Sequence, residues 1–401
     1  MHPLSMRYRE GLTAAPADLQ VPFHRASIGE EEVQAVSEAV RSGWLTMGPR
    51  TGEFESAFAR YIGVDHAIAV SSCTAALHLA LEAVGIGPED EVLVPTNTFT
   101  ATAEVVTYLR AKPVLVDVEA ATLNLDPIDA ARRLTSHTRA IIPVHFGGQP
   151  ADMTKIRELA DRHGLHVIED AAHSLPASYR GARIGSASEV TAFSFYATKT
   201  LTTGEGGMIT TSNEACAERM RIMRLHGIGR DAWKRYSAAG SWQYEVLAAG
   251  FKYNMTDIQA ALGLVQLKKC DAMRQRRAQV AAQYTSAFDQ IAALEPPSVP
   301  GDQESSWHLY VLRLHLECLR INRNDFIVEV RNRGISTSVH FIPLHLHPYY
   351  QNSFGYHVGD LPVAEREYQR CISLPIYPDM NHDEIQRVIE VISEVCEIHR
   401  A

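Results

Sequence analysis

One lysine of this chain, Lys199, lies between two apolar runs that are typical of buried strands. The first run covers residues 190–195 and the second covers residues 208–211, with a Gly-rich turn at 204–207 just before the second. An amine whose pKa is lowered by partial burial can attack an aldehyde and form a Schiff base. A lysine at a strand end more often packs its stem and keeps its charged head in water, and this segment alone favours that ordinary role.

The turn from Ser71 to Ala75 has the residue types of an anion site. Its small and hydroxyl residues follow an apolar run at 67–70 and precede a helical pattern. Free backbone amides at the N-terminus of such a helix, together with the helix dipole, bind phosphate. Ser and Thr also cap helices with no ligand present, and capping is the commoner explanation for one such turn taken singly.

A carboxylate, Asp170, follows the apolar run 166–169. The carboxyl end of a parallel strand is the edge at which open α/β sheets bind ligands. An aspartate there can keep a pyridinium nitrogen protonated, or it can simply cap the next helix, and the motif alone does not decide between the two. Together the three motifs supply a phosphate cradle, a ring-nitrogen partner and an aldehyde-capturing amine. The sequence therefore predicts a site for pyridoxal 5'-phosphate (PLP).

Between residues 22 and 211, apolar runs alternate with amphipathic helical patterns. This alternation predicts an α/β fold: a mostly parallel, seven-stranded sheet between two layers of helices. The expected strands are 67–70, 91–94, 113–116, 140–144, 166–169, 190–195 and 207–211, and the expected helices are 74–84, 100–109, 127–134 and 153–163.

The rest of the chain has a different pattern, with longer helices and fewer strands, which indicates a second domain. We expect a flexible arm at 1–20, a large domain at 21–265 and a smaller α+β domain at 266–401. Residues 226–251 have no clear periodicity and form a long loop, a kind of segment that is usually functional. The later elements that we expect are helices at 214–225, 256–288, 323–333 and 382–399, and strands at 307–316 and 338–341.

Composition excludes several classes of function. The formal net charge is -9, so no basic surface favours binding to nucleic acid. No apolar run reaches the length of a membrane span, and no signal sequence is recognisable, so we expect a cytoplasmic protein. The six cysteines are scattered without a C-x-x-C pair, and the 18 histidines show no metal-binding spacing, so we expect no metal.

Seven ordered motifs resemble the sugar aminotransferases of the DegT/DnrJ/StrS family, which are fold-type-I PLP enzymes. The resemblance runs from about Val21 to the C-terminus. The matching segments are Ser42 to Pro49, Val70 to Leu77, Pro95 to Phe99, Pro143 to Gly148, Glu169 to His173, Ser194 to Lys199 and Tyr253 to Asp257.

The resemblance implies a role for each site residue. Lys199 would bind the PLP aldehyde and move the proton during transamination, Asp170 would pair with the ring nitrogen, and Phe99 would stack on the ring. His173 would lie near the phenolic oxygen of the ring. The cofactor phosphate would be held by Thr74, Ala75, Ser194 and, from a partner subunit, Asn254. Cys73 departs from the small residue that is frequent at its position and can leave a reactive thiol beside the phosphate site.

The implied reaction moves an amino group from glutamate to a nucleotide-linked keto sugar by a ping-pong mechanism, in a homodimer with shared active sites. Some similarities point to enzymes that aminate UDP- or dTDP-linked 4-keto sugars. His340 and Arg230 would contact the substrate. Other cations that can bind its diphosphate are Lys252, Arg276 and Arg277, although each alone is more often an ordinary surface charge.

The sequence leaves three alternatives open. A cyclitol-ketone aminotransferase and a non-catalytic PLP-fold regulator share much of the resemblance, and a plain nucleotide-binding α/β protein is the third. The intact Lys199, Asp170 and Phe99 disfavour the regulator. No G-x-G-x-x-G motif follows a strand, which disfavours the plain nucleotide-binding protein. The identity of the sugar, the nucleotide and the ring position stays open.

Overall fold

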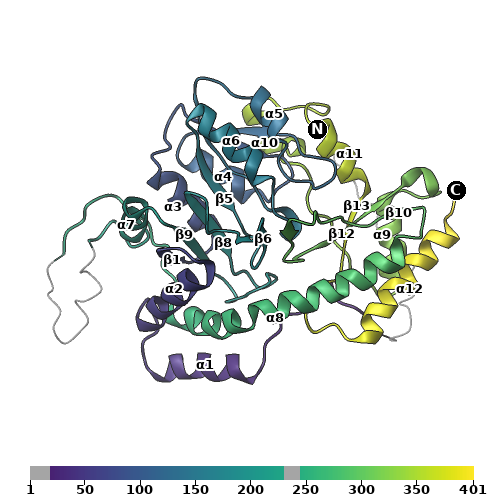
Figure 1. The fold of residues 1–401 in the computed structure, drawn as a ribbon, viewed down its shortest axis with the longest axis horizontal. Coiled ribbons are helices and arrows are strands. Elements are labelled where there is room, and N and C mark those ends of the chain that lie inside the picture. The colour runs from purple at the N-terminus through teal and green to yellow at the C-terminus, as the bar shows by residue number, and fades with distance from the viewer. Residues whose placement is uncertain (1–18, 230–243) are drawn as a thin grey trace.

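The computed structural model describes residues 19–229 and 244–401. A seven-stranded sheet in the order β1-β9-β8-β5-β4-β2-β3 forms its centre (Figure 1). Only β9 is antiparallel to its neighbours β1 and β8, and the other pairs are parallel. The predicted α/β class and mostly parallel sheet are confirmed. The strands are β1 His66–Val70, β2 Glu91–Pro95, β3 Lys112–Val116, β4 Thr138–Ile141, β5 His166–Asp170, β8 Val190–Ser194 and β9 Gly207–Thr211.

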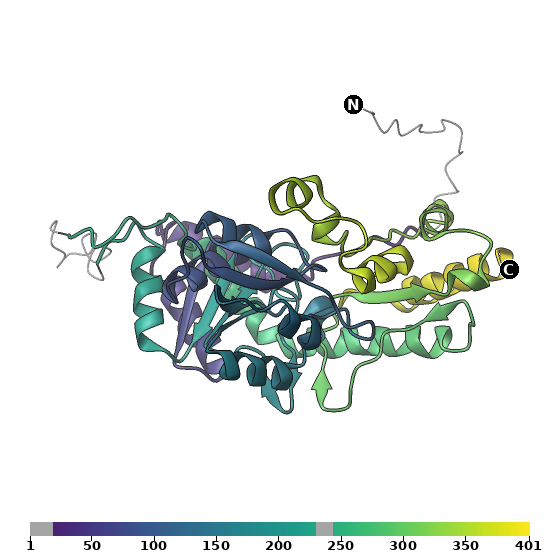
Figure 2. The ribbon, with the colours of Figure 1, turned by 90° about the horizontal axis from the view of Figure 1, so that it is seen from above.

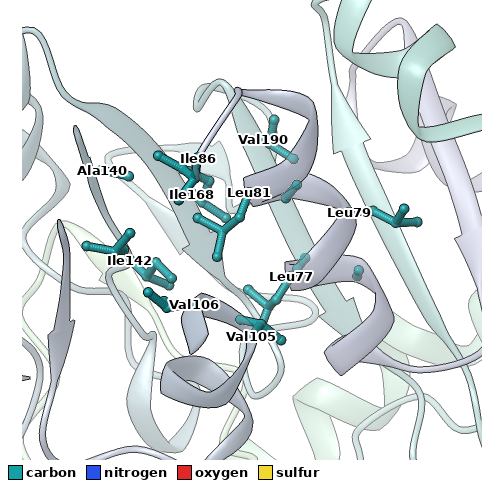
Figure 3. Close-up of a cluster of buried hydrophobic side chains, with 14 of the residues drawn as sticks. Leu77, Leu79, Leu81, Ile86, Val105, Val106, Ala140, Ile142, Ile168 and Val190 are labelled. Atoms are coloured by element: carbon teal, nitrogen blue, oxygen red, sulfur yellow. The ribbon is translucent and has the colours of Figure 1, made fainter. Parts of the chain in front are cut away.

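Helices cover both faces of this sheet because its strands carry apolar side chains on both sides. In β2, Val92 and Val94 pack in one core cluster while Leu93 packs in the cluster on the opposite face. Figure 3 shows the first cluster, in which Leu77 and Leu81 extend from a helix over the sheet. The helices of that face are α3 Cys73–Ala83, α4 Ala101–Tyr108 and α7 Glu214–Met223, and those of the other face include α2 Pro49–Ile62, α5 Pro127–Arg132 and α6 Met153–His163.

A smaller part follows, with its own core around a three-stranded antiparallel sheet. The sheet order is β10-β12-β13, and Val21 joins this core through a bridge to Ile335. Its elements are β10 Leu294–Glu295, β12 Tyr310–Leu314, β13 Cys371–Leu374, α9 Arg323–Asn332, α11 Pro362–Arg370 and α12 His382–Ile398. The helix α10 Pro348–Phe354 lies between them in the chain but packs Tyr350 into the core of the large sheet. In Figure 2 this part lies beside the large sheet.

One long helix, α8 Asp257–Phe288, belongs to both parts. Its 32 residues pack against α2 and against α1 Glu30–Arg41 near one end and against α12 near the other (Figure 1). A capping box at Thr256 and Gln259 fixes its start. The domain boundary that we expect after residue 265 falls inside α8 and stays a prediction.

The predicted strand at 338–341 is wrong. Only Ser338 forms a bridge, to Ser373, and the backbone amide of Phe341 donates instead to the side chain of Asn97. This segment therefore leaves the small sheet and turns toward the large one.

A third, three-stranded sheet pairs β11 Gln303–Glu304 with the hairpin β6 Ser178–Tyr179 and β7 Ala182–Arg183. Among the helices that the structure describes, none is both long enough and apolar enough to span a lipid bilayer.

Candidate active site

Ser72, Asp170 and Lys199 lie at one edge of the large sheet. β1, β5 and β8 run in the same direction, so their carboxyl ends meet at that edge. Ser72 follows β1, Asp170 ends β5, and Lys199 lies in the loop after β8. The three sequence motifs thus come together where open α/β sheets bind ligands.

The N-terminus of α3 is built as an anion site. Oγ of Ser72 caps the helix by accepting the backbone amide of Ala75 at 3.1 Å. The amide of Thr74 has no acceptor among the described residues, so it is available to a ligand. Gly207 of β9 backs this turn so closely that a Cβ there would lie 2.6 Å from the carbonyl carbon of Ser72. Of the two predicted amides, Thr74 is therefore free and Ala75 already serves the cap.

Asp170 is a buried carboxylate that only neutral groups contact in the described structure. Oδ1 accepts the backbone amide of Ala172 at 3.0 Å, and Oδ2 accepts the hydroxyl of Thr102 at 2.8 Å. Burial raises the pKa of Asp170, against the opposing effects of these two hydrogen bonds and of the Lys199 charge. A buried carboxylate of this kind is suited to a cationic partner such as a protonated ring nitrogen.

Lys199 is held in a tight loop between β8 and β9. Its backbone amide donates to the carbonyl of Tyr196 at 2.9 Å, and the amide of Phe195 donates to Gly206 at 2.9 Å to close the base of the loop. Burial lowers the pKa of the Lys199 amine to about 8, while Cys73 and Asp170 act in the opposite direction. About a tenth of such an amine is uncharged at pH 7, against well under a hundredth for an ordinary lysine. Lys199 is therefore suited to attack an aldehyde.

His173 is neutral and faces the same space. Burial is the main cause that holds the pKa of His173 well below its usual value, with the charges of Lys199 and His340 adding to it. The ring lies 6.0 Å from that of Phe341, centroid to centroid, in a stacked arrangement. The site around Lys199 therefore contains a histidine that donates or accepts hydrogen bonds without carrying charge.

The segment around His340 brings the small part of the molecule to the site. Burial, with Lys199 as the second cause, lowers the pKa of His340 to about 4, and its Nδ1 lies 2.9 Å from the hydroxyl of Ser373. The next residue, Phe341, packs its ring 6.2 Å from that of Phe99. Phe99 is nevertheless 61% exposed, so its ring can contact a ligand.

Two predicted phosphate ligands have clear positions. Ser194 is the last residue of β8, and its Oγ accepts the amide of Tyr196 at 3.4 Å. The backbone of Asn254 bridges to Val70, next to the α3 turn of the same chain. Within the described residues, the side-chain hydrogen bonds of Asn254 go to Met255 and Lys252.

The cationic side chains that we expect to bind the diphosphate lie in different environments. Arg277 is 1% exposed and donates to the carbonyl of Ile376 at 2.6 Å, and Arg276 donates to the carbonyl of Met380 at 2.6 Å, so both hold the small part together. Lys252 is exposed, beside Asn254. Arg230 and most of the predicted loop at 226–251 lie outside the described residues.

Sequence reasoning missed three residues of the site: Thr102, Phe341 and His308. The ring of His308 lies 4.4 Å from that of His173, and its buried Nδ1 has no hydrogen-bond partner in the described part of the chain. Burial, followed by the charges of His173 and Lys199, holds the pKa of His308 well below its usual value. No local pattern distinguishes these residues, because their neighbours come from distant elements.

Comparison with known proteins identifies the family of this chain. The family model described as the DegT/DnrJ/EryC1/StrS aminotransferase family matches residues 26–393. The chain belongs to this family. The uncharacterized protein MJ1066 of Methanocaldococcus jannaschii is 50% identical to it over 95% of this chain and 98% of MJ1066. The spore coat polysaccharide biosynthesis protein SpsC of Bacillus subtilis is 49% identical over 94% of this chain and 97% of SpsC.

A solved relative identifies the cofactor. The PLP form of Spr1654 from Streptococcus pneumoniae, named as a candidate sugar aminotransferase, superposes with a TM-score of 0.88 and 33% identity over 95% of this chain and 99% of that one. This chain is a PLP-dependent sugar aminotransferase. Its residues fit the cofactor: the free amide at α3 suits a phosphate, and the buried Asp170 suits a protonated pyridine nitrogen.

Proposed function

We propose that this enzyme moves the amino group of glutamate to a nucleotide-linked keto sugar, with a 4-keto group and UDP or dTDP as the nucleotide. The observation that carries the chemistry is the meeting of Lys199, Asp170 and the α3 turn at one sheet edge. A sugar as acceptor is supported by the family and by SpsC, which is named for polysaccharide biosynthesis. The nucleotide, the ring position and the glutamate donor rest on the sequence motifs.

When bound, PLP supplies an aldehyde carbon for the amine and an electron-poor ring that accepts the electron pair released at the substrate carbon. The amine of Lys199 attaches the cofactor in the resting enzyme. The same amine, when free, would move the proton at the substrate carbon, so one residue would be both nucleophile and general acid–base. The lowered pKa of Lys199 suits both tasks near neutral pH.

The other residues of the site orient the cofactor ring and hold its phosphate. Asp170 keeps a proton on the ring nitrogen, Phe99 covers the ring face, and neutral His173 donates to the phenolic oxygen. The free amide of Thr74, the hydroxyl of Ser194 and the side chain of Asn254 hold the phosphate, and the amide of Ala75, which is bonded to Oγ of Ser72, keeps the turn in shape. We assign contacts with the sugar nucleotide to His340 and Arg230.

We also propose that the enzyme is a homodimer in which Asn254 reaches the phosphate of the partner's site. The hydrogen bonds of its side chain go to Lys252 and Met255 rather than to the α3 turn of its own chain. If these two hydrogen bonds break, the side chain of Asn254 is available to a neighbouring subunit.

A panel of acceptors tests the proposed substrate. Purified enzyme with PLP and glutamate is offered UDP- and dTDP-linked 4-keto sugars, a 3-keto sugar nucleotide and a free cyclitol ketone, and the release of 2-oxoglutarate is measured. We expect the highest kcat/KM with a 4-keto sugar nucleotide. Turnover of the cyclitol ketone alone would instead assign the enzyme to cyclitol amination.

A further inference from the structure

Two hydroxyl groups lie in line behind the carboxylate of Asp170. Oγ1 of Thr102, in the first turns of α4, lies 2.8 Å from Oδ2 of Asp170, and Oγ1 of Thr98 lies 2.8 Å from Oγ1 of Thr102. All three side chains are buried, with exposed fractions of 4% or less. The chain Thr98–Thr102–Asp170 is therefore buried away from water.

We propose that Thr102 is a positioning residue: backed by Thr98, its hydroxyl fixes the orientation and the negative charge of Asp170. This inference rests on the proposed role of Asp170 as the partner of the ring nitrogen. It assigns a task to two residues of the segment 98–102 that the reaction itself does not use.

The direction of the hydrogen bonds carries the inference. An ionised carboxylate only accepts, so the single proton of the Thr102 hydroxyl must point to Asp170. A lone pair of Thr102 is then free to accept the proton of Thr98, and each bond polarises the next. A protonated Asp170 could donate to Thr102 with the order reversed, but hydrogen bonds between neutral groups are roughly half as strong as those to an ionised acceptor. The chain thus favours the ionised carboxylate.

This preference matters because burial works against the charge. Burial raises the pKa of Asp170, and the two hydrogen bonds, from Ala172 and Thr102, oppose that effect. The other titratable groups that face Asp170 are Lys199 from the β8–β9 loop, His145 after β4, and Cys73 at α3. Lys199 and His145 favour the negative charge, whereas burial raises the pKa of Cys73, so its thiol stays neutral.

The test uses Thr102→Val, which keeps the shape and removes the hydroxyl, with Thr102→Ser as the conservative variant. The matched control is Thr191→Val on β8, where the hydroxyl is equally buried but has no hydrogen-bond partner within the described residues. Apoprotein is titrated with PLP to obtain the dissociation constant, and kcat/KM is followed from pH 5 to pH 9.

We expect Thr102→Val to weaken PLP binding about tenfold or more, the size of one hydrogen bond to a charged group. We also expect the acid limb of kcat/KM to move to higher pH, because the carboxylate is harder to ionise without its donor. Thr102→Ser and Thr191→Val should match the wild type in both measurements. Thr98→Val should move the acid limb in the same direction by a smaller amount.

An unchanged dissociation constant and acid limb in Thr102→Val would overturn the proposal. If that variant does not fold, as shown by circular dichroism of the apoprotein, Thr98→Val decides, since it leaves the Thr102 bond in place. An unchanged acid limb in Thr98→Val would then overturn it. Asp170→Asn separates this failure from that of the proposed function: if Asp170→Asn loses activity while the Thr variants do not, only the positioning role falls.

Discussion

The backbone amide of Gly147 donates a hydrogen bond to Nδ1 of His173 at 3.2 Å. Because Nδ1 accepts and the ring is neutral, its one proton lies on Nε2. The turn that places this amide needs glycine at the next position, since Gly148 has a φ of +100° and a Cβ there would collide with the hydroxyl of Ser306. The segment Pro143 to Gly148 therefore sets the tautomer of an active-site histidine.

The tautomer gives a prediction for His173. Its Nε2–H can only donate, so a glutamine, whose amide also donates, should replace it with less than about a tenfold loss of PLP affinity. Leucine fills the same space without a donor and should lose more, by roughly the contribution of one hydrogen bond. PLP titration of the two apoprotein variants measures the difference. Equal affinity in His173→Leu and wild type would show that the histidine makes no contact with the cofactor.

Asp170→Asn should still bind PLP, although more weakly than the wild type, and should lose turnover by several decades. The neutral amide cannot hold the ring nitrogen protonated, and removing one partner of a buried ion pair costs about 3–5 kcal/mol. The absorbance of bound cofactor and single-turnover rates with glutamate separate binding from chemistry. Near wild-type turnover would mean that Asp170 only caps the segment after β5.

The pKa of Lys199 predicts how fast apoprotein captures PLP. The protonated amine cannot attack the aldehyde, so the rate of capture should rise with pH and reach half of its plateau near the pKa of about 8. Stopped-flow absorbance over pH 6 to 10.5 measures the profile. A midpoint near the usual lysine value of about 10.4 would mean that burial does not activate this amine.

The proposed sharing of each site between two subunits predicts complementation between two inactive variants. Neither Lys199→Ala nor Asn254→Ala should support full activity as a homodimer. In a hybrid dimer, one of the two sites would contain both native residues if Asn254 acts across the interface. Co-expression with two affinity tags yields the hybrid, and activity well above that of either parent is expected. If Asn254 serves its own chain, both hybrid sites lack one residue and the mixture stays as inactive as the parents.

The large sheet could be predicted from the sequence because several of its strands are continuous apolar runs that alternate with helical patterns. The observed strand ends differ from the predicted ones where the backbone cannot continue the sheet hydrogen bonds. The predicted strand at 140–144 includes Pro143, which has no N–H to donate, and β4 ends at Ile141. Val144 keeps only an isolated bridge, to Asp170. At 338–341 the periodicity was that of a strand, but Phe341 turns away to contact Asn97.

The site was predictable only where a residue follows a strand in the chain. Asp170, Lys199 and the α3 turn occupy strand ends, and the order of strands brings strand ends together. Thr102 lies inside a helix, and its contact with Asp170 depends on how α4 packs on the sheet, against β2 and β3. His308 approaches His173 only because the segment after β11 docks on Gly148, where the amide of Ser306 donates to the carbonyl of Gly148 at 3.1 Å. Contacts of this kind cannot be predicted from the spacing of residues along the chain.

The attachment point of the cofactor tests the account most directly. PLP-loaded enzyme is reduced with borohydride, digested, and mapped by mass spectrometry. We predict one pyridoxyl-modified peptide, carrying the label on Lys199, and no stable label in a folded Lys199→Ala variant. A label on any other lysine in the wild-type enzyme would contradict the assignment of Lys199 and, with it, the roles that we derive from its neighbours.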